Sequence, residues 1–181
     1  KIAFITEAEG TNEGFRNVKD IVRDTGITDL RTDIAWMYAL NADLYSLLDN
    51  FEIIKGYDYV IVIWPKGETT LNAVGVDQRP GVENPLSPYL HEHGLETLKQ
   101  NNHKVCYMQE GPVWFFNDYS IPDQIRFYNI IMESDIIFCH NKCDINWYKG
   151  LFPDKEIRIM PTLMIDSDLS NMNVEKEDKV I

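Results

Sequence analysis

Short apolar runs alternate with amphipathic segments along this chain of 181 residues. Each of five runs is rich in apolar residues and leads into a polar, glycine or proline segment; they lie at 2–6, 57–64, 104–109, 135–139 and 156–160. Uninterrupted apolar runs of this length are typical of strands that are buried on both faces of a parallel sheet. The run at 57–64 is β-branched and nearly uninterrupted, which predicts the central strand.

Between these runs, apolar residues recur every three or four positions, which is the spacing of one buried helix face. This spacing predicts a helix from Phe15 that ends before Gly26, and further helices over 32–48, 88–100, 121–132 and 144–151. Residues 68–86 contain glycines and prolines but few periodic apolar residues, which predicts a long loop. The aromatic residues 113–119 fit no single pattern.

Strands that alternate with helices predict an α/β fold, a Rossmann-like three-layer sandwich with a mostly parallel sheet. Right-handed crossovers would place the carboxyl ends of all strands at one edge of the sheet, where ligands bind in such folds. We call this edge the rim, and expect it to carry the loops 7–14, 65–67, 109–112, 140–142 and 161–162. Residues 1–165 are predicted to form this domain, and 166–181 a charged linker.

The net charge and the cysteines of the chain disfavour several classes of partner and site. The chain has 17 Lys and Arg against 29 Asp and Glu, a net charge of −12 that disfavours nucleic acid and acidic membranes as partners. Cys106 and Cys139 lie in apolar runs, and with Cys143 they make an odd number without a zinc-binding pattern. This predicts free thiols and a reducing, cytoplasmic location. No apolar run is long enough to predict a transmembrane segment.

Two rim residues are candidates for catalysis. Glu110 follows a predicted strand and precedes Gly111-Pro112, so it could act as a base or accept hydrogen bonds from sugar hydroxyls. The alternative is a solvated loop acid or a helix cap. His140 begins the turn after another strand and could act as a base or a donor. Its alternative is a turn that only caps the next helix near Asn141.

Further rim residues are candidates for binding a substrate. Gly10 and Gly14 either allow a ligand to approach the backbone or permit a tight turn. Lys66 either binds an anion or extends into water, and Trp114 either stacks on sugar rings or packs in the core. The full set of predicted substrate-binding residues is Gly10, Asn12, Gly14, Lys66, Gln109, Trp114, Asn141 and Lys142.

The common nucleotide and hydrolase motifs are absent from the sequence. There is no G-x-G-x-x-G, no G-x-x-x-x-G-K-[ST] and no G-x-S-x-G, which argues against NAD binding, P-loop phosphoryl transfer and an α/β serine hydrolase. We therefore predict no cofactor and no metal site.

The stretches SDIIFCHN (134–141) and EIRIMPTLMID (156–166), joined by a short predicted helix, resemble the N-terminal lobe of GT-B glycosyltransferases of the family 4 type. In that family an Asp-x-hydrophobic strand, a short helix and a strand that ends in proline lead into the interdomain linker. Pro161 matches this proline, and Thr162-Leu163 replaces the Asn-Gly that commonly follows it.

The resemblance implies a function in sugar transfer. In the family, this lobe mostly binds the hydroxyl-bearing acceptor, and a C-terminal lobe, absent from this chain, binds the nucleotide-sugar donor. The chain would then be half of an enzyme and inactive alone, because catalysis requires both lobes to hold the acceptor hydroxyl beside the anomeric carbon. Two alternatives stay open: a flavodoxin-like or receiver-like binding module, and another α/β enzyme such as a nucleotide-processing one.

Overall fold

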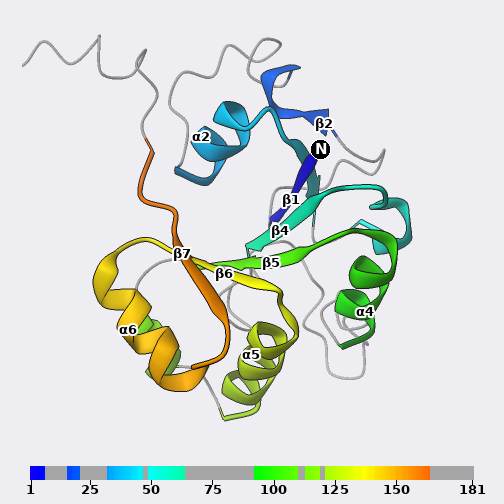
Figure 1. Cartoon of the computed structure of the whole chain (residues 1–181). Coiled ribbons are helices and arrows are strands. Elements are labelled where there is room, and N and C mark those ends of the chain that lie inside the picture. Colours follow the sequence, from blue (N-terminus) through cyan, green and yellow to red (C-terminus); the bar gives the residue numbers. More distant parts are fainter. Residues whose placement is uncertain are drawn as a thin grey trace, which may run out of the picture.

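The protein forms an α/β sandwich around a mostly parallel sheet, which confirms the predicted fold class (Figure 1). The structure is a computed structural model that describes residues 1–6, 16–20, 32–46, 49–63, 92–109, 113–118 and 121–163. The sheet has seven strands in the order β2-β3-β1-β4-β5-β6-β7. Only β2 is antiparallel to its neighbour. The strands are β1 (Ile2–Thr6), β2 (Arg16–Asn17), β3 (Asp43–Ser46), β4 (Tyr59–Ile63), β5 (Val105–Met108), β6 (Ile136–Cys139) and β7 (Glu156–Ile159).

Helices cover both faces of the sheet (Figure 1). From β4 to β7 the chain moves across the sheet in one direction, so right-handed crossovers place all three connecting helices on the same face. The step from β1 to β3 runs the opposite way and places its helix on the other face. In the described ranges, α2 (Thr32–Ala39) lies on one face, and α4 (Glu92–Asn101), α5 (Ile121–Glu133) and α6 (Lys142–Leu151) lie on the other. Two 3-10 helices, η1 (Phe51–Ile53) and η2 (Val113–Asp118), are also described.

The core consists of two layers, one on each side of the sheet. Alternate residues of each strand enter opposite layers: in β5, Tyr107 packs under the α4–α6 face, whereas Cys106 packs under α2. The Tyr107 ring meets Phe127 of α5 edge to face, with ring centres 5.4 Å apart. β4 lies between β1 and β5, so the run at 57–64 is central as predicted.

The helix predicted over 32–48 is wrong in its second half. It ends at Ala39, because Asn41 adopts a left-handed conformation with φ of 50°. The N–H of Ala42 then donates to the carbonyl of Met37 at 2.9 Å, closing a Schellman turn of the kind that glycine or asparagine permits. The chain turns sharply and continues as β3, a buried strand that pairs in parallel with β1.

The strands β1, β4, β5, β6 and β7 and the helices α4, α5 and α6 agree in type with the sequence, with shifted bounds. Arg16–Asn17 form β2 instead of the first turn of a helix, and helical residues begin at Val18. The aromatic segment forms η2. The predicted loop 68–86 and linker 166–181 lie outside the described residues. No helix in the described ranges is long and apolar enough to cross a bilayer.

Candidate functional site

The carboxyl ends of the parallel strands meet at one edge of the sheet, as the sequence predicted. Met108 pairs with Phe138, and Cys139 pairs with Ile159, so the next residue of each strand reaches the rim beside the others. These next residues are Gln109, His140 and Met160. The predicted Gly10, Asn12, Gly14, Lys66 and Glu110 lie outside the described residues, as does the side chain of Trp114 in η2.

A buried hydrogen-bonded group joins the end of β5 to the start of α6. Asp144 is 5% exposed and Gln109 is 3% exposed. One carboxylate oxygen of Asp144 accepts hydrogen bonds from Nε2 of Gln109 and from Nδ2 of Asn141, both at 2.9 Å. Asp144 was not among the predicted site residues, although its spacing from Asn141 is that of a capping box, in which the cap residue and the third helical residue bond each other.

Asn141 caps α6, so the cap expected in the turn after His140 is present. Its Oδ1 accepts the backbone N–H groups of Cys143 at 2.8 Å and Asp144 at 3.1 Å. These are two of the N–H groups that a helix leaves without an internal partner. The oxygen and the nitrogen of the Asn141 side-chain amide are therefore both bonded within this turn. Lys142 is the first residue of the helix and is exposed.

His140 is half-buried, and a backbone carbonyl orients its ring. Nδ1 lies 3.2 Å from the carbonyl oxygen of Met160, at the end of β7. A carbonyl oxygen can only accept, so Nδ1 carries the proton and Nε2 of the neutral ring is the acceptor. Among the described residues, Nε2 has no hydrogen-bond partner. An oriented imidazole with an available acceptor nitrogen has the geometry of a general base.

A second polar group lies at the ends of β1 and β3. Thr6 pairs with Ser46, and both are buried. The carboxylate of Asp49 accepts the N–H of Ser46 at 2.7 Å. Burial raises the pKa of Asp49 above its usual value, and the Ser46 bond opposes part of the rise. This group was not predicted, because the residues of β3 were expected to be helical.

The strand order reverses at β1, beside Thr6 and Ser46. β1 lies between β3 on one side and β4 on the other, and all later strands follow on the β4 side. In open α/β sheets the ligand crevice lies outside the carboxyl ends of the strands at such a point. Thr6, Ser46 and Asp49 lie at that point of the rim, whereas Gln109 and His140 lie farther along it, at the ends of β5 and β6.

Another connected group of ionisable residues lies at the opposite edge, where strands begin. The Tyr57 hydroxyl donates to Asp43 at 2.8 Å and lies 2.9 Å from the hydroxyl of Tyr45, and Nζ of Lys1 lies 2.9 Å from Asp43. Burial raises the pKa of Tyr57 to about 12. These groups bind one another and join the starts of β1, β3 and β4, so we assign them a structural role.

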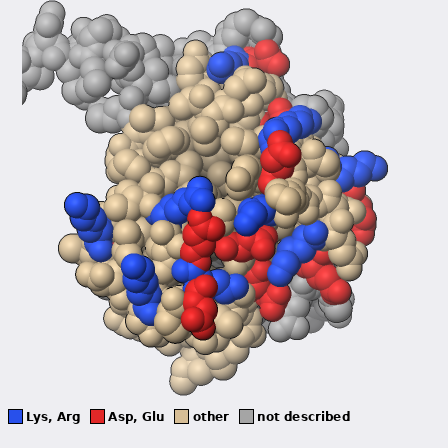
Figure 2. Space-filling model, viewed as in Figure 1, with Lys and Arg blue, Asp and Glu red and all other residues tan. Residues whose placement is uncertain are grey.

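Charged side chains are unevenly distributed over the face that Figure 2 shows. Charged side chains gather over the lower and right parts of Figure 2, whereas the region around α2 is mostly uncharged. Trp36 of α2 donates from Nε1 to the carbonyl of Pro161 at 2.7 Å, which joins this region to the end of β7. Among the described residues, no group of three His, Cys, Asp or Glu side chains could hold a metal ion.

Comparison of the chain with models of protein families, with curated proteins and with solved structures finds no match.

Proposed function

We propose that the chain is the acceptor-binding lobe of a GT-B-type glycosyltransferase, which transfers a sugar from a nucleotide-sugar donor to a hydroxyl group. Two features support the proposal: the sheet of parallel strands with its polar rim, and the resemblance of residues 134–141 and 156–166 to that lobe. The observation that carries it is His140, which stands at the rim with Nε2 as an acceptor.

In this proposal His140 is the base of the transfer step. Nε2 takes the proton from the acceptor hydroxyl while the hydroxyl oxygen bonds to the anomeric carbon, and the bond from that carbon to the nucleoside diphosphate breaks. The Met160 carbonyl stabilises the imidazolium that forms, because it already accepts the proton on Nδ1. Glu110, which follows Gln109, is predicted to accept hydrogen bonds from other hydroxyls of the bound sugar.

Binding to the chain itself can be measured directly. We expect mono- and oligosaccharides, titrated into ¹⁵N-labelled chain, to shift the backbone amides of Gln109 and residues 140–142. His103 lies on the exposed opposite edge, at the start of β5, and provides a matched control histidine. Its amide should not move. If no saccharide moves the rim amides, the acceptor-lobe proposal is wrong.

Turnover tests the role of His140 in a protein that joins this chain to a donor-binding lobe. His140→Gln should lower the release of nucleoside diphosphate by about 100-fold or more, the usual contribution of a general base, while His103→Gln leaves it unchanged. Wild-type turnover in His140→Gln would remove His140 from the mechanism. Long-range ¹H–¹⁵N NMR should also show the proton on Nδ1 of His140.

The strand order favours a second candidate, a flavodoxin-like binding module. The parallel strands β3-β1-β4-β5-β6 have the order 2-1-3-4-5 of that fold, in which a flavin binds where the order reverses. A flavin that copurifies with the protein, or that binds it when added, would support this module. We prefer the glycosyltransferase lobe because a further strand, β7, is followed by Pro161, in the order that the resemblance implies.

A further inference from the structure

The outer face of α5 is an apolar stripe. Ile121, Ile125, Tyr128 and Met132 are 72%, 58%, 40% and 41% exposed, and the opposite face of the helix packs into the core. A helix on the surface of a globular domain usually presents polar or charged residues to water. We call these four side chains the α5 stripe.

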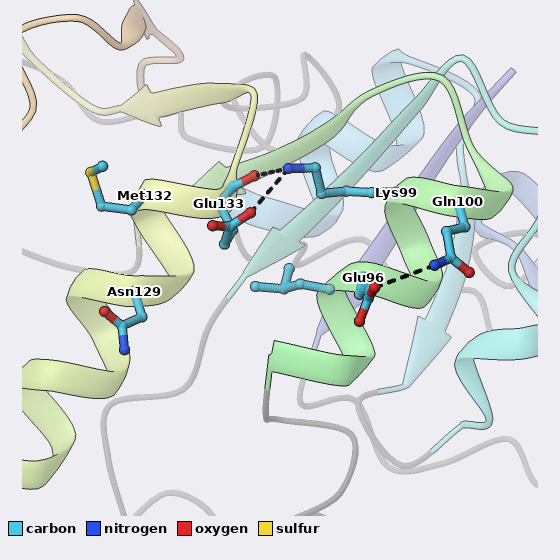
Figure 3. A pocket seen from close by; sticks show the side chains of 7 residues that line it. Glu96, Lys99, Gln100, Asn129, Met132 and Glu133 are labelled. Atoms are coloured by element: carbon cyan, nitrogen blue, oxygen red, sulfur yellow. Dashed lines mark hydrogen bonds and ion pairs between the residues drawn. The ribbon is translucent and has the colours of Figure 1, made fainter.

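A groove of about 590 Å³ between α4 and α5 continues the stripe (Figure 3). Its apolar lining is Leu95 and Met132, and Met132 also belongs to the stripe. One polar pair spans the groove: Nζ of Lys99 lies 2.9 Å from the carbonyl oxygen of Glu133 and 3.2 Å from its carboxylate. The groove therefore adds apolar surface beside Met132.

The spacing of the stripe suits another helix as its partner. The steps from Ile121 to Ile125, Tyr128 and Met132 are four, three and four residues, which is the a/d pattern of helices that pack with knobs into holes. The pairs 121/132 and 125/128 have the same midpoint. A second α5 that crosses antiparallel at this midpoint would place Ile121 opposite Met132 and Ile125 opposite Tyr128.

We propose that a second copy of this chain covers the α5 stripe, in a two-fold symmetric dimer with antiparallel α5 helices. A two-fold interface requires a patch that is complementary to itself, and the common midpoint provides this. The arrangement also brings Glu133, at the carboxyl end of α5, toward the partially positive amino end of the other α5.

The expected dimer is weak and depends on salt. The stripe exposes roughly 400 Å² of apolar surface per chain, on the order of the largest patch of an ordinary monomer. A standard interface buries about 800 Å² per partner, so the groove and the flanking surface must supply the rest. Each chain carries a net charge of −12, and the resulting repulsion is screened by salt. Association should therefore strengthen as salt is raised.

Sedimentation velocity over a wide range of chain concentration tests the proposal. The mass should rise with concentration from 21.1 kDa toward twice that value. Ile125→Glu should weaken association by more than about tenfold, because it places an unpaired carboxylate beside the two-fold axis. Ile53→Glu is the matched control, since Ile53 is 44% exposed on η1, away from α5. A wild-type chain that stays at 21.1 kDa at every concentration and salt overturns the proposal, as does an Ile125→Glu variant that associates like the wild type.

A charge-pair experiment tests the antiparallel arrangement. Ile121→Glu and Met132→Lys each place a charge at the helix end whose dipole favours it, so both variants should fold. Each alone should associate weakly. An equal mixture should recover association, because Glu at 121 of one chain then faces Lys at 132 of the other. If the wild type dimerises but the mixture associates no better than the single variants, the antiparallel arrangement is wrong.

Discussion

Asp144→Ala perturbs the rim at the residue that joins β5 to α6. The substitution removes the acceptor of two hydrogen bonds, from Nε2 of Gln109 and Nδ2 of Asn141. A hydrogen bond to a charged group contributes about 1.5–3 kcal/mol, and a buried donor that loses its acceptor costs about 1–3 kcal/mol. The lost hydrogen bonds and the donors left without an acceptor are partly the same loss, so the two figures cannot be added. Asn141 is exposed, so water can replace part of what its side chain loses. We therefore expect the free energy of unfolding to fall by about 2–4 kcal/mol.

Urea unfolding, followed by circular dichroism and tryptophan fluorescence, measures this loss. Asp144→Asn keeps an oxygen acceptor, so it should lose about half as much stability as Asp144→Ala. Asp154→Ala provides the control, because Asp154 is an exposed aspartate beyond the end of α6. A loss below about 0.5 kcal/mol for Asp144→Ala, the range of ordinary surface substitutions, would refute the assigned role of the network.

A double-mutant cycle tests whether Asp144 and Asn141 act together. Asn141→Ala alone should cost about 1 kcal/mol through the lost helix cap. Because the two side chains bond each other, the double variant should lose less than the sum of the single losses. Losses that add completely would show that the contact between the two side chains contributes nothing to stability.

Three further measurements test groups away from the rim. Thiol reagents should modify one cysteine of the folded chain, Cys143, which is exposed. Burial raises the pKa of Cys106 to about 12 and also raises the pKa of Cys139, so these two thiols should not react. Labelling of a second thiol without unfolding would contradict this prediction. The raised pKa of Tyr57, about 12 against 10.0 in the unfolded chain, means that the unfolded state ionises first. The free energy of unfolding should then fall as pH rises from about 10 to 12, and this fall should be smaller in Tyr57→Phe than in the wild type. If the free energies of unfolding of the two proteins depend on pH in the same way, the raised pKa of Tyr57 is refuted. Lys155→Ala removes an ammonium group from the last carbonyls of α5 and should lower the urea midpoint, by about 1 kcal/mol in free energy; an unchanged midpoint would show that these bonds are not stabilising.

The strands that the sequence predicted correctly share one property, a run of apolar residues that no helical spacing explains. β4 is the clearest case, because its residues are β-branched and lie between two other parallel strands. β3 was missed because Leu40 and Leu44 continue the helical spacing of α2. Asn41 marks the boundary, since asparagine is one of few residues that adopt the left-handed conformation readily. This signal was present in the sequence and was outweighed by the periodicity.

The candidate site was predicted in position but not in detail. Gln109 and His140 were placed on the rim because Gln109 ends one predicted strand and His140 follows another, and parallel strands end at the same edge. The partners of these residues could not be predicted. The contact of His140 with the Met160 carbonyl depends on the register between β6 and β7, and the bond from Gln109 to Asp144 depends on how α6 packs against β5.

The sequence by itself determined the α/β class, the central strand and the edge at which the parallel strands end, because apolar periodicity and the handedness of crossovers act over a few residues or a single crossover. Only the tertiary structure decided that β3 inserts beside β1, that Asp144 is buried, that the proton of His140 is on Nδ1 and that α5 leaves an apolar face exposed. These features depend on contacts between residues far apart in the chain. The free energy of such contacts depends on register and packing, which no local pattern in the sequence encodes.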